Sequence, residues 1–216
     1  MEILMNQVHR ENTFIAPQVS IGCRSGSDFE DVLSIISGIE TKTFDKNSKI
    51  LKTYSLNTAL GQMIAISDNH GLYLLEFMDR PGLEHKIVRL QIRLKAHIIP
   101  GITDSIRSVE DELKAYFNGK LRKFTTAIHP LGSPFQKLVW KKLCDIPYGQ
   151  TWTYSEQAAS IEKPTACRAV ANANGVNQIA IVIPCHRVIN SNGKLGGYTG
   201  GVRRKKWLIE HEKTYR

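Results

Sequence analysis

The segment Ile179-Ala180-Ile181-Val182-Ile183-Pro184-Cys185-His186-Arg187-Val188-Ile189 joins an apolar run to a thiol and an imidazole that are direct neighbours. The run is typical of a buried segment, and the pair after it combines a nucleophile with a base. Neighbouring side chains in a strand point to opposite faces, so we do not expect Cys185 and His186 to share a direct hydrogen bond. Either the backbone turns sharply after the proline, or a water molecule connects the two side chains. A carboxylate is then needed to hold the imidazole, and the tail at residues 207–212 offers candidates.

The residues before this segment are expected to be helical. Ser133-Pro134-Phe135-Gln136 predicts a helix start, because Ser caps, Pro occupies the first turn and Gln completes a capping box. Two short helices follow, at residues 154–160 and from Pro164 to about residue 174, and their tight connection indicates a helix-turn-helix. The second helix is rich in Ala, with Arg168 as its one long cation. Such a surface suits close approach to a narrow groove of DNA, while simple packing in the core is the alternative.

Residues 53–128 show an α+β pattern without evident chemistry. Residues 55–65 and 72–78 are β-like runs around a turn-rich connection. An apolar stripe then predicts one helix, and residues 106–117 predict a second. The stripe of the first helix consists of Leu83, Ile87, Leu90, Leu94 and Ile98. We interpret this block as a scaffold.

The net charge of +9 is unevenly distributed, because residues 133–216 hold 13 Lys and Arg against 5 Asp and Glu. This asymmetry indicates a polyanionic partner, although a merely soluble basic surface is the alternative. The cations expected to contribute to the field are Lys137, Lys141, Arg203, Arg204, Lys205 and Lys206.

The four cysteines, Cys23, Cys144, Cys167 and Cys185, lie far apart and form no Cys-x-x-Cys pair. This spacing predicts neither a metal site nor a disulfide framework, and it fits a reducing compartment. The apolar run from Ile179 to Pro184 has six residues, far fewer than the roughly 20 residues of a membrane span. The first residues lack a signal-peptide pattern. We therefore expect a cytoplasmic protein with no membrane partner, associated with the nucleoid in a bacterium or nuclear in a eukaryote.

The signature at residues 183–188 resembles that of the O6-alkylguanine-DNA alkyltransferases (methylated-DNA–protein-cysteine methyltransferases), of the Ogt type and the C-terminal part of the Ada type. Spacing is kept without a gap from Arg168 to Glu212. The further matching motifs are Ser133-Pro134-Phe135-Gln136, Ile146-Pro147-Tyr148-Gly149, Thr153-Tyr154, Arg168-Ala169-Val170, Asn177, Gly197-Tyr198-Thr199-Gly200-Gly201, Trp207-Leu208 and His211-Glu212. Residues 1–52 stay unmatched, although residues 21–29 loosely resemble the last helix-turn-helix of AraC-type regulators.

The resemblance implies that Cys185 accepts an alkyl group, mainly methyl, from O6 of a flipped-out guanine and is not regenerated. His186 would take the thiol proton through a water molecule, and Glu212 would orient the imidazole. Asn177 is similar to the family's hinge residue. Tyr154 would press on the rotating phosphate and protonate guanine N3.

The resemblance also implies a partner, double-stranded DNA that contains O6-alkylguanine, with O4 of thymine open as a second target. It implies no cofactor and a monomer in solution. Arg168 would fill the hole left in the base stack. The other DNA contacts would come from Tyr154, Ser155 and Ala169, and the base would meet Tyr198, Thr199 and the backbone around Val188.

The expected fold class is α+β. A ribonuclease-H-like α/β subdomain at residues 53–128 would precede a mainly helical subdomain at residues 129–216 that contains the helix-turn-helix. Residues 1–52 would form an extension with an AraC-type helix-turn-helix remnant, and residues 29–36 within it are expected to be helical. The chain has Thr199 where many relatives have Ser, which narrows the pocket, and Ala171-Asn172 where some have two glycines.

Two other functions stay open at this stage. A lesion-binding or regulatory DNA-binding protein would recognise the base without transfer, although such binders commonly replace the cysteine with Trp. A Cys-His hydrolase would regenerate its thiol and turn over.

Overall fold

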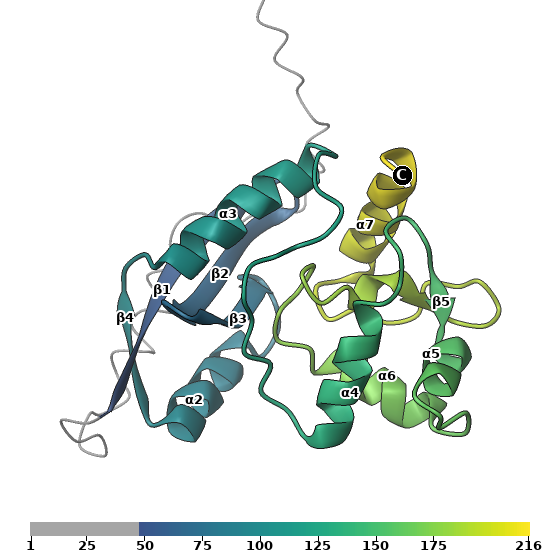
Figure 1. Ribbon diagram of the computed structural model, residues 1–216, viewed down its shortest axis with the longest axis horizontal. Helices are drawn as coiled ribbons and strands as arrows, with labels where there is room; N and C mark the ends of the chain where they lie inside the picture. The colour runs from purple at the N-terminus through teal and green to yellow at the C-terminus, as the bar shows by residue number, and fades with distance from the viewer. Residues whose placement is uncertain (1–47) are drawn as a thin grey trace, which may run out of the picture.

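The computed structural model describes residues 48–216. The helix expected near residues 29–36 and the AraC-like segment at residues 21–29 lie outside this range. The chain has an α+β fold in which a sheet with two helices is followed by a mainly helical part (Figure 1).

The sheet contains strands β1 (Lys49–Thr58), β2 (Gly61–Asp68), β3 (Gly71–Phe77) and β4 (Ala96–Pro100) in the order β3-β2-β1-β4. The first three strands are antiparallel, whereas β4 pairs parallel to β1. The β-like run expected at residues 55–65 is thus two strands, because the chain turns just before Gly61, whose φ is 109°. Strand β1 also crosses the boundary expected between residues 52 and 53, since its first residues pair with a strand far along the sequence.

Helices α2 (Leu83–Leu94) and α3 (Asp104–Phe117) cover opposite faces of the sheet (Figure 1). The expectation that one helix carries the stripe from Leu83 to Ile98 is wrong at its end. Lys95 adopts a left-handed conformation, with φ 48° and ψ 50°, and stops the helix. Ile98 instead lies on β4, where it is buried against the same apolar cluster as the α2 stripe.

The second part contains α4 (Pro134–Leu143), β5 (Trp152–Thr153), α5 (Tyr154–Ser160), α6 (Cys167–Gly175), the 3-10 turn η2 (Cys185–Arg187), β6 (Val188–Ile189) and α7 (Val202–Thr214). Capping boxes start α4, from Ser133 to Gln136, and α5, from Thr153 to Glu156. The helix expected to open at Pro164 begins only at Cys167, because residues 164 and 165 form a turn.

The two parts share one apolar core. Strand β3 hydrogen-bonds the segment after α6: Leu75 N donates to the Gln178 carbonyl at 2.9 Å, and Ala180 N donates to the Leu75 carbonyl at 2.8 Å. Helix α7 lies beside the C-terminal end of α3 (Figure 1), where Phe117 contacts Trp207. Among residues 48–216, no helix combines the length and the apolar character needed to cross a bilayer.

Candidate functional site around a buried cysteine

Asn177 organises the loop that carries the thiol. Its Nδ2 donates to the Ile183 carbonyl at 2.9 Å and to Cys185 Sγ at 3.3 Å, while its Oδ1 accepts from Ile179 N at 3.0 Å. Asn177 is 3 % exposed, so all of these bonds lie in the interior. One amide side chain thus ties the end of α6 to the reactive loop and touches the sulfur directly.

The backbone turns sharply at the cysteine, which is the first of the two alternatives that the sequence left open. Residues Cys185–Arg187 form a single 3-10 turn after Pro184, whose ψ of 59° departs from a strand. The described contacts include no hydrogen bond between Cys185 and His186. His186 Nε2 instead lies 2.8 Å from Glu212 Oε1. Because a carboxylate only accepts, Nε2 carries the proton and leaves Nδ1 as a lone-pair base.

His186 Nδ1 is buried and accepts no hydrogen bond from the described residues. The imidazole is fully buried. Burial lowers the pKa of His186, and the adjacent carboxylate of Glu212 only partly opposes this effect. His186 is therefore neutral at pH 7 and is able to accept a proton at Nδ1.

Glu212 collects five hydrogen-bond donors. Its Oε1 accepts from His186 Nε2, from Tyr116 Oη at 2.8 Å and from Arg187 Nη2 at 3.0 Å. Its Oε2 accepts from Arg187 Nε at 2.8 Å and from Gly149 N at 3.2 Å. Burial alone would raise the pKa of Glu212, but its bonds to His186 and Arg187 hold that pKa well below the usual range. The carboxylate is ionised and fixed, which in turn fixes the imidazole.

Two cations act on the buried thiol. Burial raises the pKa of Cys185, while the Asn177 amide and the positive charges of Lys205 and Arg80 oppose that rise. Lys205 is fully buried, donates to the Gly197 carbonyl at 3.1 Å, and has its pKa lowered by burial to about 8. Deprotonation of the thiol therefore depends on a base and on local charge.

Cys185 faces a pocket of about 340 Å³. Its lining consists of Tyr154, Ala171, Asn172, Asn174, Gly175, Cys185, Gly197, Tyr198 and Thr199. The Tyr198 hydroxyl is buried without a hydrogen-bond partner among the described residues. Burial raises the pKa of Tyr154, so its hydroxyl remains a proton donor at neutral pH. The pocket thus combines a nucleophile with two phenols and one aliphatic hydroxyl.

The other residues expected in the site lie outside this pocket. Arg168, Ala169 and Ser155 are exposed on α6 and α5. Val188 is fully buried in β6, paired with Trp152, and does not line the pocket.

The expected cationic field needs a correction. Arg204 and Lys205 are 6 % and 0 % exposed and cannot reach a phosphate. Their cations instead bind carbonyl groups and a carboxylate inside the protein, because both side chains lie on the inner face of α7. The exposed members of the set are Lys137, Lys141, Arg203 and Lys206.

Sequence reasoning missed Tyr116 and Arg187, which both bind Glu212. The scaffold interpretation of residues 53–128 is wrong in this respect. A signal for Tyr116 existed, because it lies three residues after Leu113 on the buried stripe of α3, and a buried phenol needs a partner. Arg187 follows the histidine directly, but neighbouring residues in the sequence do not predict that its side chain is only 7 % exposed.

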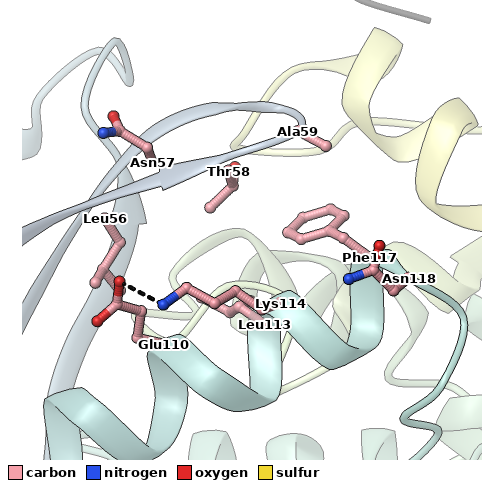
Figure 2. A pocket seen from close by; sticks show the side chains of 9 residues that line it. All are labelled: Leu56, Asn57, Thr58, Ala59, Glu110, Leu113, Lys114, Phe117 and Asn118. Carbon is pink, nitrogen blue, oxygen red and sulfur yellow. Dashed lines mark ion pairs between the residues drawn. The ribbon is translucent and has the colours of Figure 1, made fainter. Parts of the chain in front are cut away.

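A second hollow, of about 200 Å³, lies between the β1–β2 turn and α3 (Figure 2). Its lining combines apolar side chains, the polar side chains of Asn57, Thr58 and Asn118, and a 2.9 Å ion pair between Glu110 and Lys114. No cysteine or histidine is among the residues that line it. The described part of the chain brings no three His, Cys, Asp or Glu side chains together in a metal-ligating group. The chemistry therefore centres on Cys185.

Fold and site define an α+β protein in which a buried cysteine nucleophile, served by a histidine–carboxylate pair, faces a pocket. The family model for the 6-O-methylguanine DNA methyltransferase DNA-binding domain matches residues 134–214. A Methanosarcina mazei methylated-DNA–protein-cysteine methyltransferase is 47% identical over 137 residues, which cover 62% of this chain and 86% of the relative. A Methanosarcina barkeri protein of the same name is 56% identical over 106 residues, or 49% of this chain and 67% of the relative. This chain belongs to the methylated-DNA–protein-cysteine methyltransferase family.

A solved structure agrees with this assignment. The crystal structure of Mycobacterium tuberculosis OGT in complex with DNA matches with a TM-score of 0.65 and 37% identity, and the match covers 77% of this chain and 94% of that one.

Proposed function

We propose that this protein repairs DNA by direct reversal, with irreversible transfer of an alkyl group, mainly methyl, from O6 of guanine to Cys185. The observation that carries the proposal is the position of Cys185 Sγ, which faces the pocket while Asn177 holds it and the His186–Glu212 pair lies beside it. The family relatives named above act as methylated-DNA–protein-cysteine methyltransferases, which supports the same reaction here.

In the reaction, His186 Nδ1 takes the thiol proton through a water molecule. The thiolate attacks the alkyl carbon in line with the carbon–O6 bond, so a carbon–sulfur bond forms as the carbon–oxygen bond breaks. Tyr154 gives a proton to guanine N3, and the base leaves as a neutral group. The product is a thioether without a good leaving group, so each chain acts once and needs no cofactor.

The substrate is double-stranded DNA with the alkylated guanine rotated out of the stack. Extrusion costs a few kcal/mol, and less for a poorly paired base. Arg168 enters the space that the base leaves, while Tyr154, Ser155 and Ala169 contact the backbone around it. Because phosphate contacts dominate, binding is salt-sensitive and weakly dependent on sequence.

In this proposal α5 and α6 form the helix-turn-helix, and the sheet with α2 and α3 is the ribonuclease-H-like subdomain. We propose the division expected from the sequence, into an N-terminal extension, a sheet subdomain that ends at residue 128 and a helical subdomain at residues 129–216. The sheet subdomain begins at Lys49, the start of β1. The protein acts as a cytoplasmic monomer.

Stoichiometry tests the proposal. The protein is mixed with an excess of duplex oligonucleotide that carries one O6-methylguanine, and restored guanine is counted over time. We expect a plateau at one guanine per chain, and none for Cys185→Ala. Continued turnover would point to a hydrolase, whereas tight lesion binding without restored guanine would make this a damage-recognition protein.

A further inference from the structure

The pocket has two walls that belong to different segments. One wall is the C-terminal half of α6 and ends at Gly175, and the other is the loop segment at residues 197–199, with Tyr154 and Cys185 completing the lining. The Thr199 hydroxyl donates to the Gly175 carbonyl at 3.0 Å and so bridges the walls at one end. Away from this hydrogen bond, the distance between the two walls depends on the residues that bind each wall from outside the pocket.

Arg80, from the connection between β3 and α2, holds the α6 wall. Its Nη2 donates to the Gly175 carbonyl at 3.4 Å, the same group that Thr199 binds. Arg80 is 8 % exposed and forms an ion pair with Glu76, which is also buried. Lys86 binds the same carboxylate at 3.2 Å and donates to the Asn177 carbonyl at 3.0 Å. A buried charge cluster of the sheet subdomain thus holds the end of α6 at two carbonyls.

Asp79, the residue before Arg80, holds the opposite wall through Arg204. Both Asp79 oxygens bind the Arg204 guanidinium, at 2.8 and 2.9 Å, and that guanidinium donates to the Gly200 carbonyl at 3.0 Å. The guanidinium also lies 4.1 Å from the centre of the Phe77 ring. A Cβ at Gly200 would lie 2.8 Å from the same ring, so the loop packs directly onto β3.

We propose that Asp79 and Arg80 form a clamp that sets the width of the alkylguanine pocket, and hence which adducts Cys185 accepts. They are positioning residues, since neither lines the pocket. The inference rests on the proposed function and adds a determinant of adduct size in the subdomain that carries none of the reacting groups. Reaction rates are sensitive to such positioning, because a misplacement of about 1 Å can slow a reaction about 100-fold.

Two variants separate the clamp from folding and from local charge. Asp79→Ala removes the ion pair with the buried Arg204. The Asp79 side chain itself is 44% exposed, and the Arg204 guanidinium keeps its hydrogen bonds to the Leu60 and Gly200 carbonyls, so the variant should be less stable but still fold. Arg80→Lys keeps a cation for Glu76 near the thiol but lacks the second nitrogen that reaches Gly175. The matched control is Asp68→Asn, which breaks an ion pair with Lys49 in the same sheet, away from the pocket.

The measurement is the first-order transfer rate in saturated complexes with two duplexes, one with O6-methylguanine and one with O6-benzylguanine. We expect both clamp variants to transfer methyl about tenfold more slowly. Benzyl transfer should fall less, because a wider pocket relieves the larger group, so the benzyl-to-methyl ratio should rise at least about fivefold.

An unchanged ratio in both variants, matching Asp68→Asn, would overturn the clamp while leaving the proposed function intact. Wild-type protein that transfers no alkyl group from either duplex would instead contradict the proposed function, and the clamp with it. Rates are normalised to the folded fraction by near-ultraviolet circular dichroism, so loss of folding cannot imitate either result.

Discussion

Replacing Glu212 with Gln should destabilise this protein more than most conservative substitutions do, because Glu212 is 1 % exposed and accepts five hydrogen bonds. A glutamine has the same size but only one acceptor oxygen, and its NH2 group must face donors. In the less damaging orientation the NH2 replaces Oε2 and meets Arg187 Nε and Gly149 N. The buried guanidinium of Arg187 is then left without a counter-charge.

Removal of one partner from a buried ion pair costs about 3–5 kcal/mol. Each unsatisfied buried donor costs about 1–3 kcal/mol, and two such donors give a similar total. This loss is a large fraction of the roughly 5–15 kcal/mol that stabilises a typical domain. We therefore expect Glu212→Gln to lower the urea midpoint by about 1–2 M.

The assay is urea unfolding at several pH values. The folded-state pKa of Glu212 is depressed, so its ionised form stabilises the protein above the unfolded pKa of about 4.3, and this contribution is lost as pH falls below that value. The difference between wild type and variant should be full at pH 7 and shrink below about pH 4. Glu210→Gln is the control, because Glu210 lies on the same helix in an exposed pair 3.7 Å from Lys206. Equal midpoints for the two variants at pH 7 would refute the reasoning.

Three further changes test separate parts of the account. Lys205→Met should raise the free energy of unfolding at pH 7, and this gain should fade between pH 8 and about 10.4, because folding lowers the pKa of the lysine to about 8. The variant should also transfer more slowly, because it lacks a cation near Cys185. A less stable variant with normal transfer would contradict this. Arg168→Ala should slow transfer from duplex DNA about 10–100-fold, as expected for loss of a few kcal/mol of extrusion energy, yet leave alkylation by free O6-benzylguanine unchanged, and an equal loss on both substrates would count against its role. Asp68→Asn should lower the free energy of unfolding at pH 7. Burial raises the pKa of Asp68, but its hydrogen bonds, including the one from Lys49, outweigh burial and lower that pKa to about 2, so the difference from wild type should vanish as pH falls from about 3.9 to 2. A difference in urea midpoint that does not change with pH would contradict this.

The local part of the site was predictable from the sequence because its signals are contiguous. Cys185 and His186 stand together after an apolar run, and the tail offered Glu212, which the structure places 2.8 Å from the imidazole. The capping boxes that start α4 and α5 are equally local, because each is formed by residues within a span of four. The sequence predicts the one at Ser133.

The remainder depended on contacts between distant segments. Tyr116 reaches Glu212 across 96 residues, and Arg80 reaches Gly175 across 95. Ile98 kept the helical spacing of the stripe before it, yet parallel pairing of β4 with β1 placed it in the sheet. The burial of Arg204 follows from packing of α7 against β3, which no charge count reveals.

The central claim is that Cys185 itself accepts the alkyl group. Peptide mass mapping after reaction with a duplex that contains one O6-methylguanine tests it most directly. The account predicts a gain of one methyl group on the peptide that carries Cys185, with the peptides of Cys144 and Cys167 unchanged. An unmodified Cys185 in protein that has restored guanine, or a methyl group on another residue, would contradict it.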